Sequence, residues 1–132
     1  MIFIPGQEFN ENFKISEKTY NDFINLFKDK NPLHTDEDYA IARGFKSKVM
    51  HGNILNGLVS YFIGECLPVK DVIIHSQEIQ FKYPVYLNDE LQISATVSEV
   101  YESVNAVIFK IKFINAENKV VAKGKIQIGL LS

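Results

Sequence analysis

The chain has 132 residues, of which 46% are hydrophobic and 23% charged. Typical domains hold about 100–150 residues, so residues 1–132 are expected to form one domain. The apolar content is high enough to offset the entropy of folding, which excludes intrinsic disorder. Fourteen basic and sixteen acidic residues give a formal charge of −2. Because a basic excess is lacking, nucleic acid is not an expected partner.

Cysteine usage and hydropathy bear on the compartment. Cys66 is the only cysteine, so it can form neither an intrachain disulfide nor a multi-thiolate metal site. Residues 1–5 lack the basic segment and the apolar stretch of about 7–15 residues that mark a secretory signal. The longest segment without Lys, Arg, Asp or Glu, residues 49–64, is shorter than the roughly 20 residues of a membrane-spanning helix. We therefore expect a cytoplasmic protein with no membrane partner.

A first helix is predicted by apolar residues that recur on one face: Tyr20, Phe23, Ile24 and Phe27. Ser16 or Thr19 can cap its start, and the helix should end near Lys28. Proline disfavours the helical conformation of the residue before it, so Asn31-Pro32 predicts an irregular, stiff turn over residues 29–34.

A second group of helical signals follows. A short helix should begin at Asp36, and residues 44–48 should form a loop. Residues 52–67 then carry apolar pairs at helical spacing and almost no charged residue, up to Pro68. A helix this apolar is normally enclosed by other structure.

The second half of the chain changes to period two. Alternating apolar and polar residues predict four strands, near residues 73–81, 91–98, 107–113 and 120–130. The connections are short enough for antiparallel neighbours, and residues 2–14 are expected to add one more strand. The predicted fold class is therefore α+β, with an antiparallel sheet curled around one apolar helix.

The turn after the first helix carries the first chemical signal. Asp29 and His34 flank Asn31-Pro32, so a rigid turn could bring a carboxylate and an imidazole toward one point. Such a pair has the acid–base groups that the reversible addition of water requires. The alternative interpretation is ordinary turn chemistry, in which Asp29 and Asn31 only shape the backbone.

The second signal is His51-Gly52 at the start of the apolar helix. Helix N-termini carry unpaired N–H groups that favour negative charge, and Gly52 has no Cβ to block a ligand. A carbonyl oxygen bound to the Gly52 N–H would be polarised, and developing enolate charge would be stabilised. Alternatively, Gly52 serves only a tight helix entry, and His51 is a capping or packing residue.

Together these residues resemble a known family. The sequence Asp-Lys-Asn-Pro-Leu-His at residues 29–34, followed by Val-Met-His-Gly at residues 49–52, is similar to the MaoC-like hydratases, including (R)-specific enoyl-CoA hydratases of the hot-dog fold. Ser60 matches a serine of that family's central helix. Weaker similarity continues through Gln77, Phe81 and residues 84–90.

The resemblance implies a homodimer that binds an acyl thioester, carried by coenzyme A or by an acyl-carrier protein. Asp29 and His34 would hold a water that adds to a trans-2-enoyl thioester and gives the (R)-3-hydroxyacyl product, or would run the reverse dehydration. Gly52 N–H would bind the thioester oxygen, while Asn31, His51 and Ser60 would support the site. No cofactor is implied beyond the coenzyme A of the substrate.

Some residues have a simpler interpretation beside the functional one. Ser60 can instead bond a backbone carbonyl one turn earlier. Arg43, Lys46 and Lys48 could meet the phosphates of coenzyme A, although a solvated loop is the simpler explanation. His75 has no partner at metal-ligand spacing, so no metal site is expected.

Two other functions remain open. Hot-dog thioesterases resemble one another in placing a carboxylate on or near the central helix. Glu65, close to the end of the predicted helix, is its only carboxylate. A non-catalytic acyl-CoA-binding module is the other alternative, although the intact Asp29 and His34 pair argues against it.

Overall fold

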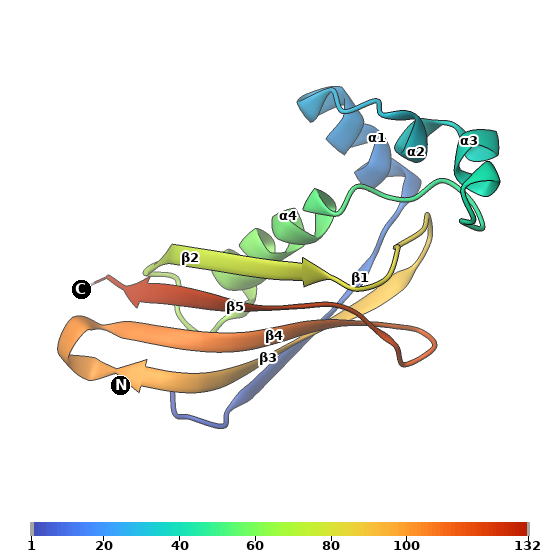
Figure 1. Cartoon of the computed structure of the whole chain (residues 1–132). Coiled ribbons are helices and arrows are strands. Elements are labelled where there is room, and N and C mark those ends of the chain that lie inside the picture. The colour runs from blue at the N-terminus through green and yellow to red at the C-terminus, as the bar shows by residue number, and fades with distance from the viewer. Residues whose placement is uncertain (1, 132) are drawn as a thin grey trace.

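The computed structural model describes residues 2–131 and contains one antiparallel sheet with helices on one side of it (Figure 1). In chain order the elements are β1 (Glu8–Lys14), α1 (Glu17–Phe27), α2 (Pro32–Thr35), α3 (Glu37–Ala42), α4 (Asn53–Tyr61), a π-helical turn (Phe62–Cys66), β2 (Val72–Phe81), β3 (Glu90–Tyr101), a 3-10 turn (Glu102–Val104), β4 (Ala106–Asn115) and β5 (Val120–Leu130).

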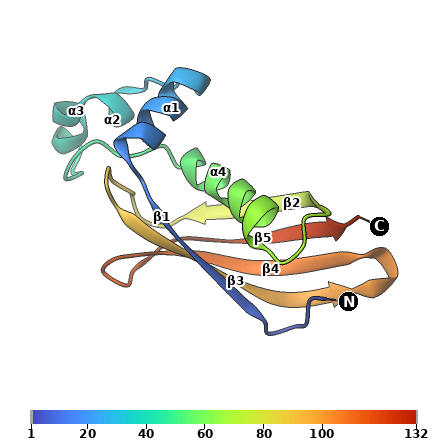
Figure 2. The ribbon, with the colours of Figure 1, turned by 180° about the vertical axis from the view of Figure 1, so that it is seen from behind.

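The strand order is β1-β3-β4-β5-β2, so β1 and β2 form the two edges of the sheet. Seen from behind, α4 runs along one face of the curved sheet, while α1, α2 and α3 gather beyond one end of it (Figure 2). No helix within residues 2–131 is both long and apolar enough to cross a bilayer.

The core lies between α4 and the inner face of the sheet. Alternation in β4 sends Phe109, Ile111 and Phe113 inward, where each is at most 3% exposed, while Lys110 and Lys112 face outward. Each buried side chain of this size contributes about 1.5–3 kcal/mol through removal from water. From the other side the core receives α4 and the π-helical turn, through Ile54, Leu55, Val59, Phe62 and Ile63.

The four predicted strands are confirmed, but the additional strand is wrong in its first half. The strand covers only residues 8–14, and in the described part of the chain backbone hydrogen bonds to β3 reach back no further than Gly6, whose N–H donates to the carbonyl of Val97 at 2.8 Å. Gly6 has a φ of 93°, and the N–H of Gln7 donates to the carbonyl of Ile4 at 3.1 Å. This conformation is a turn, so pairing with β3 cannot start before it.

The apolar helix is confirmed over most of its predicted length, with two differences. Its last turn widens into the π-helical segment, and Leu67, which precedes Pro68, is extended. The sheet also covers only one side of α4. On the other side Gly57 and Ser60 are exposed. Within one chain the helix is therefore half enclosed.

Candidate active site

Asp29 takes its position from the way α1 ends. Ser16 caps the start of α1, and at its end Lys28 adopts the left-handed conformation with a φ of 66°. The N–H of Lys28 still donates to the carbonyl of Ile24 at 2.8 Å. The chain turns sharply here, and the Oδ1 of Asp29 then accepts the N–H of Asn31 at 3.2 Å. The second carboxylate oxygen of Asp29 is left for the site.

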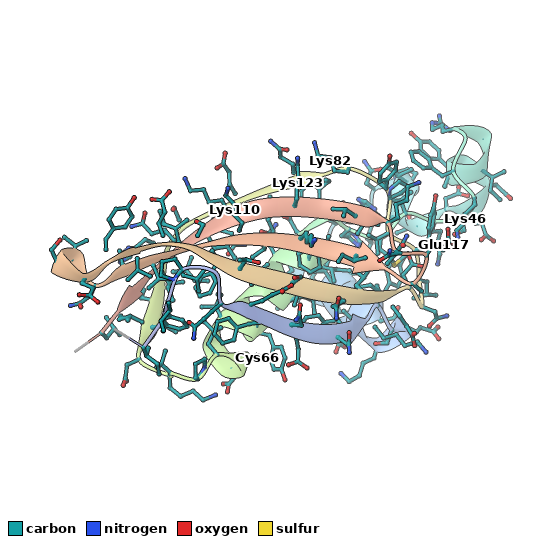
Figure 3. The ribbon with its side chains drawn as sticks, turned by 90° about the horizontal axis from the view of Figure 1, so that it is seen from below. Lys46, Cys66, Lys82, Lys110, Glu117 and Lys123 are labelled. Carbon is teal, nitrogen blue, oxygen red and sulfur yellow. The ribbon has the colours of Figure 1, made fainter. Side chains whose placement is uncertain are left out.

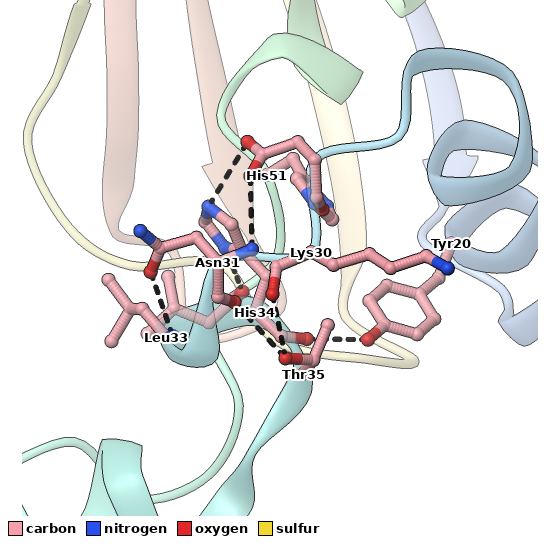
Figure 4. Close-up of polar contacts among 9 residues, drawn as sticks. Tyr20, Lys30, Asn31, Leu33, His34, Thr35 and His51 are labelled. Atoms are coloured by element: carbon pink, nitrogen blue, oxygen red, sulfur yellow. Dashed lines mark hydrogen bonds and ion pairs between the residues drawn. The ribbon is translucent and has the colours of Figure 1, made fainter.

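The turn after Asp29 is more ordered than its sequence predicts. Asn31 caps the short helix α2 by accepting the N–H of Leu33 at 3.0 Å, and Pro32 occupies the first helical position. Proline fits there because its missing N–H would have no partner in the helix. Thr35 donates to the carbonyls of Lys30 and Asn31 (Figure 4). The predicted irregular turn therefore contains one turn of helix, which holds His34.

His34 is fixed by two backbone contacts. Its Nδ1–H donates to the carbonyl of Val49 at 2.7 Å. Because a carbonyl can only accept, this bond assigns the proton to Nδ1 and leaves Nε2 facing the site. The hydroxyl of Tyr20 in α1 donates to the carbonyl of His34 (Figure 4). The imidazole is mostly buried, with 16% of its side chain exposed.

Asp29 and His34 approach each other as the sequence predicts. The Oδ2 of Asp29 lies 3.8 Å from the Nε2 of His34, and half of the Asp29 side chain is exposed. This separation is too long for a direct hydrogen bond, but both atoms can contact one water molecule. The pair is thus arranged to hold a water that remains accessible from outside.

His51 lies behind this pair and is 3% exposed. Its Nε2–H donates to the carbonyl of Asp29 at 2.8 Å, and its ring stacks on that of His34 at 4.0 Å between centroids. The ring of Phe23 also packs on the ring of His51, with 4.7 Å between the two centroids. Burial lowers the pKa of His51 below 6.5, and the hydrogen bond to the Asp29 carbonyl opposes this shift only in part. Burial thus favours the neutral imidazole, and His51 contacts both Asp29 and His34.

Gly52 lies at the start of α4, where no side chain caps the helix. Residues 49 and 50 are tied to the loop after β2, and the N–H of Met50 donates to the carbonyl of Val85 at 2.8 Å. A Cβ at Gly52 would lie 3.0 Å from the ring of Phe81. A side chain at this position would have to displace the ring of Phe81, and the open N-terminus of α4 can donate to a ligand oxygen.

These groups share one cavity of about 440 Å³. Asp29, His34, His51 and Gly52 line it, together with aromatic side chains from three other parts of the chain: Phe23, Phe45, Phe81 and Tyr83. Polar groups at one side and apolar walls around them suit an acyl group with one polar end.

The same residues provide a test of metal binding. One ligand atom each from Asp29, His34 and His51 lie within 4.8 Å of one another. The two imidazole rings, however, face each other with 4.0 Å between centroids and 30° between planes, and one nitrogen of each ring already bonds a backbone carbonyl. Because a cation binds along in-plane nitrogen lone pairs, this arrangement is poorly suited to hold one.

Two predicted supporting residues do not line the cavity. Ser60 is exposed on α4. It lies seven residues after the start of this helix at Asn53, which is about 10 Å along the helix axis. Asn31 uses its side-chain oxygen to cap α2. Asn31 thereby supports the site through the helical turn that carries His34, and the supporting role of Ser60 stays a prediction.

The other candidates have local partners. Arg43, Lys46 and Lys48 lie over the rings of Tyr39, Tyr86 and Tyr20 at 3.4, 4.6 and 4.9 Å from the ring centroids. Glu65 pairs with Lys70 at 2.8 Å and does not line the cavity. Cys66 is partly buried against the core, and this burial raises the pKa of its thiol.

Comparison with known proteins identifies the family of the chain. The model of the MaoC like domain matches residues 4–123. The chain belongs to this family. An (R)-specific enoyl-CoA hydratase of Rhodospirillum rubrum is 34% identical over 111 residues, which cover 84% of this MaoC-like chain and 76% of that enzyme. A second (R)-specific enoyl-CoA hydratase, from Aeromonas caviae, is 36% identical over 80 residues, covering 61% of this chain and 60% of that enzyme.

Solved structures confirm the predicted α+β hot-dog fold. An (R)-hydratase from A. caviae involved in PHA biosynthesis aligns with a TM-score of 0.90 at 25% identity, covering 98% of both chains. An R-hydratase from Pseudomonas aeruginosa aligns with a TM-score of 0.88 at 30% identity, covering 97% of this MaoC-like chain and 82% of the other.

Three contacts of the site are not found by sequence reasoning. Tyr20 and Phe23 are predicted only as apolar positions of a helix, yet one bonds His34 and the other packs on His51. Phe81 is at the end of β2 and packs on Gly52. No local pattern could indicate these contacts, because each joins elements distant in the sequence.

Proposed function

We propose that this MaoC-like chain catalyses the (R)-specific hydration of trans-2-enoyl thioesters to (R)-3-hydroxyacyl thioesters, and the reverse dehydration. The hydratases of R. rubrum and A. caviae support the reaction class. The observation that carries the proposal is the pair formed by Asp29 and His34, 3.8 Å apart, beside the open N-terminus of α4 in one cavity. Either coenzyme A or an acyl-carrier protein can supply the thioester.

The proposed step balances as a simple addition. The oxygen of the bound water forms a bond to the β-carbon, while one of its protons passes to the pair of Asp29 and His34. A proton from this pair adds to the α-carbon, using the electrons of the former double bond. The N–H of Gly52 holds the thioester oxygen as charge builds on it. The reaction requires no metal and no cofactor beyond the carrier of the acyl group.

The test is a hydration assay with crotonyl-CoA and chiral analysis of the product. Removing an acid–base group typically lowers the rate by about 10²–10⁴. We expect losses in this range for Asp29→Asn and for His34→Ala, without loss of folding. The controls are Asp38→Asn, an exposed carboxylate of α3, and His75→Ala, on β2. Full activity in both site variants would refute the assignment.

The same assay separates the alternatives. Release of free thiol without a hydroxyacyl product would identify a thioesterase. The pairing of Glu65 with Lys70 outside the cavity argues against this outcome. Saturable acyl-CoA binding without any product would identify a binding module instead.

We also propose that the chain is one catalytic domain that works as a homodimer in the cytoplasm. Support for the dimer comes from β2, an edge strand of the sheet, and from the exposed side of α4, where Gly57 would allow close approach of a second copy. Support for the compartment is the single free thiol of Cys66.

A further inference from the structure

Five lysines gather on the outer face of the sheet beside the cavity. We call Lys82, Lys110, Lys112, Lys123 and Lys125 the lysine face. Each is exposed, and in Figure 3 Lys82, Lys123 and Lys110 follow one another across neighbouring strands. The alternating residues of β4 and β5 that point the other way form the core. This local excess of positive charge contrasts with the formal charge of −2 of the whole chain.

The strand register brings these charges directly together. Lys110 pairs with Lys125, and Lys112 pairs with Lys123, across β4 and β5. Like charges directly opposite each other in a sheet are destabilising. Within residues 2–131 no ion pair relieves these lysines, and Glu78, opposite Lys125, is the carboxylate nearest in register. One carboxylate can offset only part of the repulsion among five lysines, and the remaining excess of positive charge points to an anionic partner.

The lysine face is continuous with the mouth of the catalytic cavity. Lys82 lines this cavity beside Phe81 and Tyr83, and the amino group of Lys119 lies 3.7 Å from the ring centroid of Tyr83. Lys123 pairs with Gln80 and Lys125 with Glu78, two and four residues before Lys82. At about 3.4 Å per residue, these two lysines lie roughly 7 and 14 Å back along the strand direction from Lys82 at the mouth of the cavity.

The extent of this surface decides the kind of partner. Lys110, Lys112, Lys123 and Lys125 line a shallow hollow of about 500 Å³ across the outer face of β2, β5 and β4. A small nucleotide is normally enclosed by a deeper pocket, and Lys82 extends the positive charge beyond this hollow to the mouth of the cavity. Several negative charges at fixed spacing on a rigid body match such a surface. A second copy of this chain would bring lysines against lysines in a symmetric contact, and repulsion excludes it.

We propose that the lysine face docks an acidic acyl-carrier protein, so that its thioester arm enters the cavity past Lys82. This inference rests on the proposed hydratase function and names the carrier of its substrate. Docking through opposite charges would raise the association rate and orient the arm.

The test compares crotonyl-CoA with a crotonyl-loaded acidic acyl-carrier protein as substrates of the whole chain. The variant is Lys110→Glu with Lys123→Glu. It places each new glutamate opposite a remaining lysine, Lys125 or Lys112, so it removes both like-charge pairs and should fold at least as well. The control, Lys18→Glu with Lys70→Glu, makes the same change of charge away from the sheet.

We expect kcat/KM for the carrier-protein substrate to fall on the order of tenfold in the lysine-face variant and to stay within about twofold for crotonyl-CoA. Salt should slow the wild-type reaction with the carrier protein and affect the variant much less. The control should resemble the wild type.

Each other outcome overturns the inference. Equal losses on both substrates would assign the lysines to coenzyme A phosphates, and no loss on either would leave the lysine face without this role. Charge-dependent sedimentation with phosphatidylserine vesicles, without any effect on the carrier substrate, would identify a membrane surface. If the wild type turns over neither substrate, the hydratase proposal itself fails.

Discussion

A Cβ added at Gly52 would lie 3.0 Å from the ring of Phe81, so a side chain fits there only if this ring moves. We predict that Gly52→Ala lowers kcat/KM for crotonyl-CoA by about 10–10³, since the added methyl group displaces the ring and disturbs the oxygen-binding N–H. Kinetic assays of Gly52→Ala combined with Phe81→Leu provide the control. Partial recovery in the double variant would show a steric cause, whereas no recovery would assign the loss to the Gly52 backbone.

His51 should make stability depend on pH. Burial lowers its pKa in the folded protein below the value of 6.5 expected when unfolded, so the unfolded chain takes up the proton first as pH falls. The free energy of unfolding should therefore decrease as pH falls through about 6.5 and level off below the folded pKa. Denaturant titrations at a series of values between about pH 8 and pH 5 measure how the free energy of unfolding changes with pH.

The same titrations of His51→Phe should show a weaker slope over that window, even if the variant is less stable throughout. His75→Phe, which changes a histidine on β2, should keep the wild-type slope. An unchanged slope in His51→Phe would contradict the assignment of a buried neutral imidazole.

Much of the candidate site could be predicted from single residues. Asp29, His34, His51 and Gly52 meet because a proline turn and a helix start fix them locally. Ser60 could not be placed in the same way, since it lies about 10 Å along α4 from the start of the helix. The match of Ser60 to a serine of the family does not indicate which side of the helix its side chain is on.

At the scale of the elements, β2 and β5 approach so closely that Gly124 admits no other residue. A Cβ there would lie 1.9 Å from the backbone carbonyl oxygen of Glu78. We predict that Gly124→Ala lowers the free energy of unfolding by more than about 2 kcal/mol, because a backbone atom cannot rotate away. Urea unfolding monitored by circular dichroism measures the loss.

Gly129→Ala is the matched control. Its Cβ would meet the Nε2 of His75 at 2.4 Å, but that atom ends an exposed side chain that can turn away. We expect a smaller loss, of about 1 kcal/mol or less. Equal losses in the two variants would show that close contact with backbone is not the deciding factor.

Strands were easier to predict than short helices. The alternation in β3, β4 and β5 is long enough to identify each strand, because one face of each is buried. Helix α2 has only four residues and depends on the cap provided by Asn31. It is too short to show a helical spacing of apolar residues, so the sequence pattern does not predict it. The turn at Gly6 is also not predicted, because apolar and polar residues alternate around it as they do in a strand.

At the scale of the whole molecule, the exposed sides of β2 and α4 predict self-association. Ile73 and Phe81 of β2 are 51% and 52% exposed. Light scattering after gel filtration should give twice the chain mass of 15.1 kDa. Gly57→Arg, on the exposed side of α4, should yield monomers that keep their helical content. A monomeric wild type would contradict the proposed dimer.

The left-handed Lys28 has a consequence for how the molecule moves. Glycine is the usual residue in this conformation, and a side chain there costs about 1–2 kcal/mol but narrows the range of backbone angles that the residue can reach. The joint between α1 and Asp29 is therefore stiff, so thermal bending of α1 should carry Asp29 along with it rather than let the two move independently.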